Sequence, residues 1–89
     1  MDTKKSYHLR EGVQVREEKF GLLFYDYRGP RLYFVPTKNL IGNDFFNGSQ
    51  SAEGLIESIR TRHRQSRRAS QQWVMQVLTE LTQKGLIHG

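Results

Sequence analysis

A short turn between two apolar runs is the feature that most limits how this chain can fold. Residues 20–25 and 31–35 are rich in aromatic and branched side chains, and the five residues between them read Asp-Tyr-Arg-Gly-Pro. Gly29 can adopt a positive φ, and Pro30 cannot donate to a central ladder, so this segment favours a tight turn. The two runs are therefore predicted to form an antiparallel hairpin.

A third strand is predicted just before this hairpin. Val13 and Val15 alternate with Gln14 and Arg16, which is typical of a strand with one wet face. With strands at about residues 12–17, 20–25 and 31–35, the first half of the chain becomes a three-stranded meander. The middle strand is apolar on both faces, so we expect both of its faces to contact something; its apolar residues are Phe20, Leu22 and Phe24 on one face and Leu23 and Tyr25 on the other.

The second half of the chain has helical spacing of its apolar residues. Thr37, Ser51 and Ser70 are candidate N-caps, which predicts helices at about residues 37–46, 51–63 and 70–84. Gly85 is a natural stop after the last of them. The predicted core positions of these helices are Leu40, Ile41, Phe45, Leu55, Ile56, Ile59, Val74, Val77, Leu78 and Leu81.

The predicted order is thus three strands followed by three helices. A three-stranded sheet needs helices to cover its apolar face, and three helices with short links form a helix-turn-helix or winged-helix arrangement. We therefore expect an α+β fold, with a three-stranded antiparallel sheet packed on a three-helix winged helix-turn-helix. The 89 residues fit one domain over residues 1–89.

The net charge of +5 comes from one segment. Residues 60–68 contain five arginines and no acid, and the rest of the chain has nine basic and nine acidic residues. The segment fits a solvated link between helices, a surface for an acidic peptide or protein, or a nucleic-acid-binding surface. Its candidate partner-binding residues are Arg60, Arg62, Arg64, Arg67 and Arg68.

The sequence offers little for catalysis. It has no cysteine, which excludes disulfides, thiolate metal sites and cysteine nucleophiles. His8, His63 and His88 share no metal-ligand spacing, and no glycine-rich phosphate loop is present. We therefore expect a binding module that is not an enzyme and has no metal or cofactor. The longest apolar run is too short to span a membrane, and we expect a cytoplasmic protein.

Two features favour peptide capture. If strand order follows the sequence, the third strand is an edge that can accept a peptide as a further strand. Trp73, with Val77 one turn further along the last helix, is predicted to line a groove beside that edge. A covered edge and a tryptophan in the core are the alternative interpretation. The predicted peptide-binding residues are Arg31, Leu32, Tyr33, Phe34, Val35, Trp73 and Val77.

Three motifs give the chain a family resemblance. Residues 15–25 read Val-Arg-x-x-x-Phe-Gly-x-Leu-x-Tyr and residues 31–34 read Arg-Leu-x-Phe, which is similar to the mycofactocin chaperone family, MftB. Residues 78–87 read Leu-x-x-Leu-x-x-x-Gly-Leu-Ile and resemble the wider PqqD-like group of peptide recognition elements. The last motif also occurs in winged-helix DNA-binding proteins, and the arginine segment belongs to neither family pattern.

The resemblance implies a role in the biosynthesis of ribosomally made, modified peptides. It implies that the leader of an MftA-like precursor adds beside the third strand and lies against the last helix, and that the chaperone delivers it to an MftC-like radical S-adenosylmethionine enzyme. Arg31 is then a candidate partner for an acidic residue of the leader. The alternative function is a winged-helix nucleic-acid binder, which would read bases through Gln71, Gln72, Gln76 and Thr79.

Overall fold

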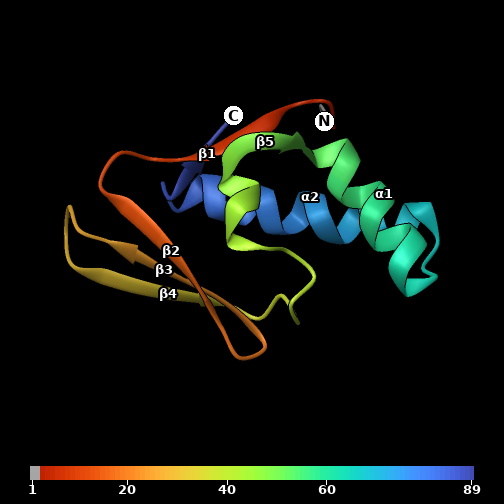
Figure 1. The fold of residues 1–89 in the computed structure, drawn as a ribbon. Coiled ribbons are helices and arrows are strands. Elements are labelled where there is room, and N and C mark those ends of the chain that lie inside the picture. Colours follow the sequence, from red (N-terminus) through yellow and green to blue (C-terminus); the bar gives the residue numbers. More distant parts are fainter. Residues whose placement is uncertain (1–2) are drawn as a thin grey trace.

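The computed structural model describes residues 3–89, which form two three-stranded antiparallel sheets, two α-helices and one 3₁₀ turn (Figure 1). The strand order is β5-β1-β6 in one sheet and β2-β3-β4 in the other. The strands are β1 (Ser6–Leu9), β2 (Val13–Glu18), β3 (Gly21–Asp26), β4 (Arg31–Val35), β5 (Asn47–Ser51) and β6 (Ile87–His88). The helical elements are η1 (Asn43–Phe46), α1 (Ala52–His63) and α2 (Arg67–Gln83).

The meander β2-β3-β4 lies at one end of the molecule (Figure 1). Its strands begin and end within one residue of the predicted ranges. Lys19 and Phe20 form the two-residue turn between β2 and β3, and residues 27–30 form the turn between β3 and β4. The meander is continuous because each strand pairs with the next one in the chain along its full length.

Serine side chains start both helices. The Ser51 hydroxyl accepts a hydrogen bond from the Gly54 N–H at 3.1 Å, and the Ser66 hydroxyl accepts one from the Ala69 N–H at 3.1 Å. Helix α2 therefore begins three residues before the predicted start at residue 70. Gly85, at a φ of +74°, ends it, and the Leu86 N–H returns to the Leu81 carbonyl at 3.1 Å.

The helix predicted over residues 37–46 is wrong. Lys38 and Asn39 have φ values of +54° and +62°, and two consecutive left-handed residues cannot continue a right-handed helix. Residues 43–46 make only a single 3₁₀ turn. Phe45 and Phe46 are nevertheless buried, because this irregular segment turns both rings into the core. The apolar spacing that resembled a helix reflects this burial.

The predicted fold class is also wrong, because the described residues form two α-helices and a second sheet in place of a three-helix winged helix-turn-helix. Strand β1 pairs with β5 on one side and with β6 on the other. The segment Asn-Gly-Ser-Gln-Ser of β5 has weak intrinsic strand preference. It is extended because β1 supplies its ladder, with a register irregularity between the pairs Ser6–Ser51 and His8–Asn47, a stretch that includes Gly48 at a φ of +82°.

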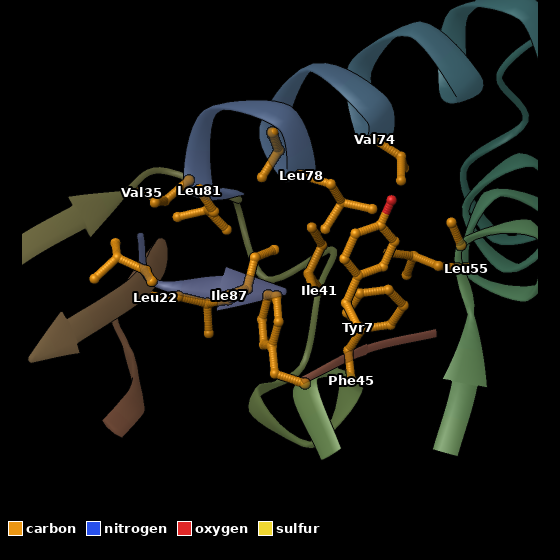
Figure 2. Packing of buried hydrophobic residues seen from close by; sticks show 14 of the residues in the cluster. Tyr7, Leu22, Val35, Ile41, Phe45, Leu55, Val74, Leu78, Leu81 and Ile87 are labelled. Carbon is orange, nitrogen blue, oxygen red and sulfur yellow. The ribbon is translucent and has the colours of Figure 1, made fainter. Parts of the chain in front are cut away.

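Helix α2 packs against both sheets and α1, and its buried stripe organises the core (Figure 2). Val74, Leu78 and Leu81 point from the helix into the cluster. They meet Leu22 and Val35 from the meander, Ile87 from β6, and Tyr7, Ile41, Phe45 and Leu55 from the rest of the chain. The position of the meander relative to α2 is therefore fixed by the core.

We expect Leu78→Ala to lower the free energy of unfolding by about 2–5 kcal/mol, because Leu78 is 1% exposed and truncation leaves a cavity. Urea unfolding followed by circular dichroism measures the change. Gln72→Ala on the exposed side of the same helix is the matched control, with an expected change within about 0.5 kcal/mol. A Leu78→Ala variant as stable as the control would contradict the packing described here.

Candidate functional site: a strand edge beside helix α2

Strand β4 is the outer strand of its sheet. It pairs with β3 along Arg31–Val35, and no other described strand pairs with it. An edge strand carries N–H and C=O groups that lack ladder partners on its open side. The open edge of β4 is therefore a place where another extended backbone can add.

Two backbone hydrogen bonds show which residues of β3 face which neighbour. The Tyr27 N–H donates to the Gly12 carbonyl at 2.8 Å, toward β2, and the Lys38 N–H donates to the Phe20 carbonyl at 2.8 Å, toward the β4 side. Successive residues of a strand direct their backbone groups to opposite sides. Odd-numbered residues of β3 therefore bond to β2, and even-numbered residues bond to β4.

This alternation assigns the open edge of β4 to two residues. Phe24 pairs with Tyr33, so the backbone groups of Tyr33 point toward β3. Leu32 and Phe34 then direct their N–H and C=O groups outward. Pro30 and Pro36 occupy the next outward positions and have no N–H. The edge thus offers two outward N–H donors, bracketed by prolines that limit further strand addition.

Tyr33 joins this edge to helix α2. Its hydroxyl donates to Glu80 Oε1 at 2.7 Å, and Lys84 Nζ lies 4.6 Å from the centre of its ring. The hydrogen bond to the Glu80 carboxylate, with a smaller contribution from burial, raises the pKa of Tyr33 and keeps the phenol protonated. The carboxyl-terminal half of α2 is therefore held beside β4. Glu80 and Lys84 were not among the predicted site residues, although they share helical spacing with Trp73.

Trp73 and Val77 lie on the same side of α2 as the residues that hold Tyr33. At about 100° per residue, positions 73, 77, 80 and 84 fall within one stripe of the helix. Val77 is buried, and Trp73 is half-buried against the core. Trp73 precedes Glu80 by seven residues, or about 10 Å along the helix axis. The indole of Trp73 thus lies on the helix side that meets β4, nearer the amino-terminal end of α2 than Glu80, with part of its surface exposed.

A charge cluster fixes the turn end of the hairpin. The Asp26 side chain is 3% exposed; it accepts hydrogen bonds from Arg28 Nε at 2.9 Å and Arg31 Nη2 at 2.8 Å. These two guanidinium groups hold the pKa of the Asp26 carboxyl well below its usual range. Arg28 also donates to the Gly85 carbonyl at 2.6 Å, which ties the turn to the end of α2. Arg31, predicted to contact a peptide, pairs with Asp26 while its side chain stays 63% exposed.

The predicted arginine cluster lies at the turn between α1 and α2, at the opposite end of α2 from Tyr33 (Figure 1). Arg60 pairs with Glu57 at 2.9 Å, and Arg67 pairs with Glu53 at 2.6 Å and with Glu57 at 3.3 Å. Arg62, Arg64 and Arg68 are exposed and form no ion pair within residues 3–89. Within the cluster, two arginines are therefore paired with glutamates, and the charges of the other three remain available to a partner.

The described residues contain no group of three or more histidine, aspartate or glutamate side chains placed to hold a metal ion. His8 and His88 stack on neighbouring strands with ring centres 5.6 Å apart, away from β4. No described helix has the length and apolar character needed to cross a membrane.

The sequence profile of the peptide chaperone MftB family matches residues 6–88. The chain belongs to the peptide chaperone MftB family. Its role is therefore that of a peptide chaperone, which is not an enzyme. No curated protein and no solved structure matches the chain. The match covers both sheets and both helices, including the β4 edge.

The Asp26 cluster predicts a specific pH dependence. The low pKa of Asp26 means that its ion pairs stabilise the folded state above the unfolded-state pKa of about 4 and that this contribution is lost as the pH falls toward the folded-state value. We expect Asp26→Asn to be less stable than the parent protein at pH 7, and the difference to shrink below about pH 4.

Urea unfolding at pH 7, 5 and 3 measures this difference. Glu18→Gln removes a carboxylate from the exposed Arg16–Glu18 pair and serves as the control, with a small effect at every pH. A difference between the parent protein and Asp26→Asn that is the same at pH 7 and pH 3 would contradict the assignment.

Proposed function

We propose that this chain binds the leader of a ribosomally made, MftA-like precursor peptide along the open edge of β4 and presents it to an MftC-like radical S-adenosylmethionine enzyme. The observation that carries the proposal is the pair of outward-facing backbone units at Leu32 and Phe34 beside α2. Membership of the peptide chaperone MftB family supports a peptide as the ligand. The winged-helix nucleic-acid alternative required three helices, whereas the described residues form two α-helices.

Backbone pairing supplies only part of the affinity. Leu32 and Phe34 offer four hydrogen-bonding groups between them, and each bond contributes about 0.5–1.5 kcal/mol net. Four such bonds give roughly 2–6 kcal/mol, whereas a micromolar complex needs about 8 kcal/mol. Side-chain burial has to supply the remainder. Inward side chains of the leader would bury against Tyr33, Val77 and Trp73.

One arginine at the site and three at the far end of α2 favour an acidic ligand or partner. Arg31 uses one side of its guanidinium for Asp26 and keeps donors for an acidic residue of the leader. Arg62, Arg64 and Arg68 would attract an acidic surface of the enzyme, with Arg60 and Arg67 already paired to glutamates. Holding the leader on the chaperone raises its effective concentration at the enzyme, so the chaperone needs no catalytic group.

The outward N–H of Leu32 gives the sharpest test. Proline at this position removes the outward donor without taking a bond from the β3 ladder, whereas Leu32→Ala shortens the side chain and keeps the N–H. We expect Leu32→Pro to weaken binding of a synthetic leader about 2- to 13-fold relative to Leu32→Ala, measured by isothermal titration calorimetry. Circular dichroism and thermal unfolding check that both variants fold.

Equal leader affinity for folded Leu32→Pro and Leu32→Ala would rule out strand addition at this edge. If Leu32→Pro does not fold, Phe34→Pro with Phe34→Ala repeats the comparison at the second outward position. Tight binding by both proline variants would require a different docking mode.

A further inference from the structure

The large apolar side chains that remain exposed gather on one sheet. Among residues 3–89, they are Phe20, Tyr27, Leu32 and Phe34, with 62%, 56%, 62% and 45% of their surface exposed. All four belong to the β2-β3-β4 meander or its turns. Scattered exposed apolar residues are ordinary, but a contiguous set marks an interaction surface.

The strand register shows that Leu32 and Phe34 form part of a continuous face. Leu23 pairs with Phe34, and Tyr25 pairs with Leu32, so these four side chains project on the same side of the sheet. The opposite side carries the buried core residues. Tyr27 adds its ring, 4.2 Å from that of Tyr25. We call this surface the outer face; it consists of Leu23, Tyr25, Tyr27, Leu32 and Phe34.

The outer face is shaped to be broad and shallow. The Phe34 ring lies against Gly21, where an added Cβ would come within 2.7 Å of Phe34 Cζ. Because Gly21 has no side chain, the Phe34 ring can lie against the backbone of β3. A hollow of about 390 Å³ lies on the same face among Gln14, Arg16, Leu23, Tyr25 and Leu32. No described part of the chain fills it.

The dimensions favour a folded protein over the leader itself. A leader added to β4 would lie about 5 Å from β4 and about 10 Å from β3, so it would flank Leu32 and Phe34 and leave Leu23 and Tyr25 uncovered. The outer face has three side chains at about half exposure, Tyr27, Leu32 and Phe34, and two that are less exposed, and together they present on the order of 400 Å². A standard interface buries about 800 Å² per partner, so the outer face suffices for the apolar centre of such an interface.

We propose that the outer face docks the enzyme that receives the peptide, through an apolar and uncharged patch on that enzyme; this rests on the proposed function. Leu32 and Phe34 belong both to this face and to the peptide-binding edge, so the two surfaces are continuous. A second copy is the competing occupant, and the oligomeric state of the parent protein distinguishes it from the enzyme. The charge excess lies at the far α1–α2 turn, which leaves the outer face itself free for apolar contact.

The continuity has a consequence for loading. A docked leader extends the sheet by one strand, and its outward side chains enlarge the outer face. The enzyme then contacts the leader as well as the outer face, so it binds the chaperone–leader complex more tightly than the chaperone alone. Linkage requires the reverse effect as well, so the enzyme tightens leader binding by the same factor.

The double variant Leu23→Thr/Tyr25→Thr tests the proposal, because it removes apolar surface from β3 while keeping good strand formers and leaving the β4 edge intact. Calorimetry measures the binding of the chaperone–leader complex to the purified radical S-adenosylmethionine enzyme. We expect about 30-fold weaker enzyme binding with leader affinity unchanged. Gln14→Thr, a polar position on the same sheet side, is the matched control and should bind the enzyme as the parent protein does.

The outcomes separate the two proposals. If the parent protein fails to bind the leader, the proposed function fails. If the leader binds and the double variant binds the enzyme as tightly as the control, the outer-face proposal is overturned. If light scattering shows that the parent protein is a dimer and the double variant a monomer, the outer face binds a second copy. That result would also overturn the outer-face proposal. If the double variant does not fold, Tyr27→Ser in the exposed turn should weaken enzyme binding about 5-fold, and unchanged binding would count against the proposal.

Discussion

The open ladder of β4 is the constraint on which the account of function depends. The backbone groups of Arg31, Tyr33 and Val35 face β3, whereas those of Leu32 and Phe34 face outward between two prolines. Unpaired strand edges invite addition of another backbone. Pro30 and Pro36 shorten the available edge, which favours a short peptide segment over extended pairing with a second sheet.

Two polar contacts and the core keep that edge beside α2. The core packs Leu22 and Val35 beneath the helix stripe, as Figure 2 shows. Tyr33 reaches Glu80 across the site, and Arg28 links buried Asp26 to the end of the helix. Strand and helix are thus placed before any peptide arrives, which reduces the ordering cost of binding.

Local sequence patterns predicted the hairpin and the edge segment but not the whole architecture. The alternation of apolar and polar residues and the turn at residues 26–30 are local signals, so the meander could be predicted from the sequence. Strand β5 was not, because Asn47–Ser51 has weak strand preference and becomes extended only by pairing with β1, some forty residues away. Similarly, the outward direction of Leu32 and Phe34 requires the register, and the contact of Tyr33 with Glu80 requires the tertiary fold. The part played by Trp73 in peptide binding stays a prediction.

Amide hydrogen exchange measured residue by residue, with and without a synthetic leader peptide, tests strand addition most directly. Strand addition at β4 predicts that the leader slows exchange at the outward amides of Leu32 and Phe34, while the amide of Tyr33, which already bonds to β3, changes little. Leader binding that leaves the exchange of Leu32 and Phe34 unchanged would contradict docking at this edge.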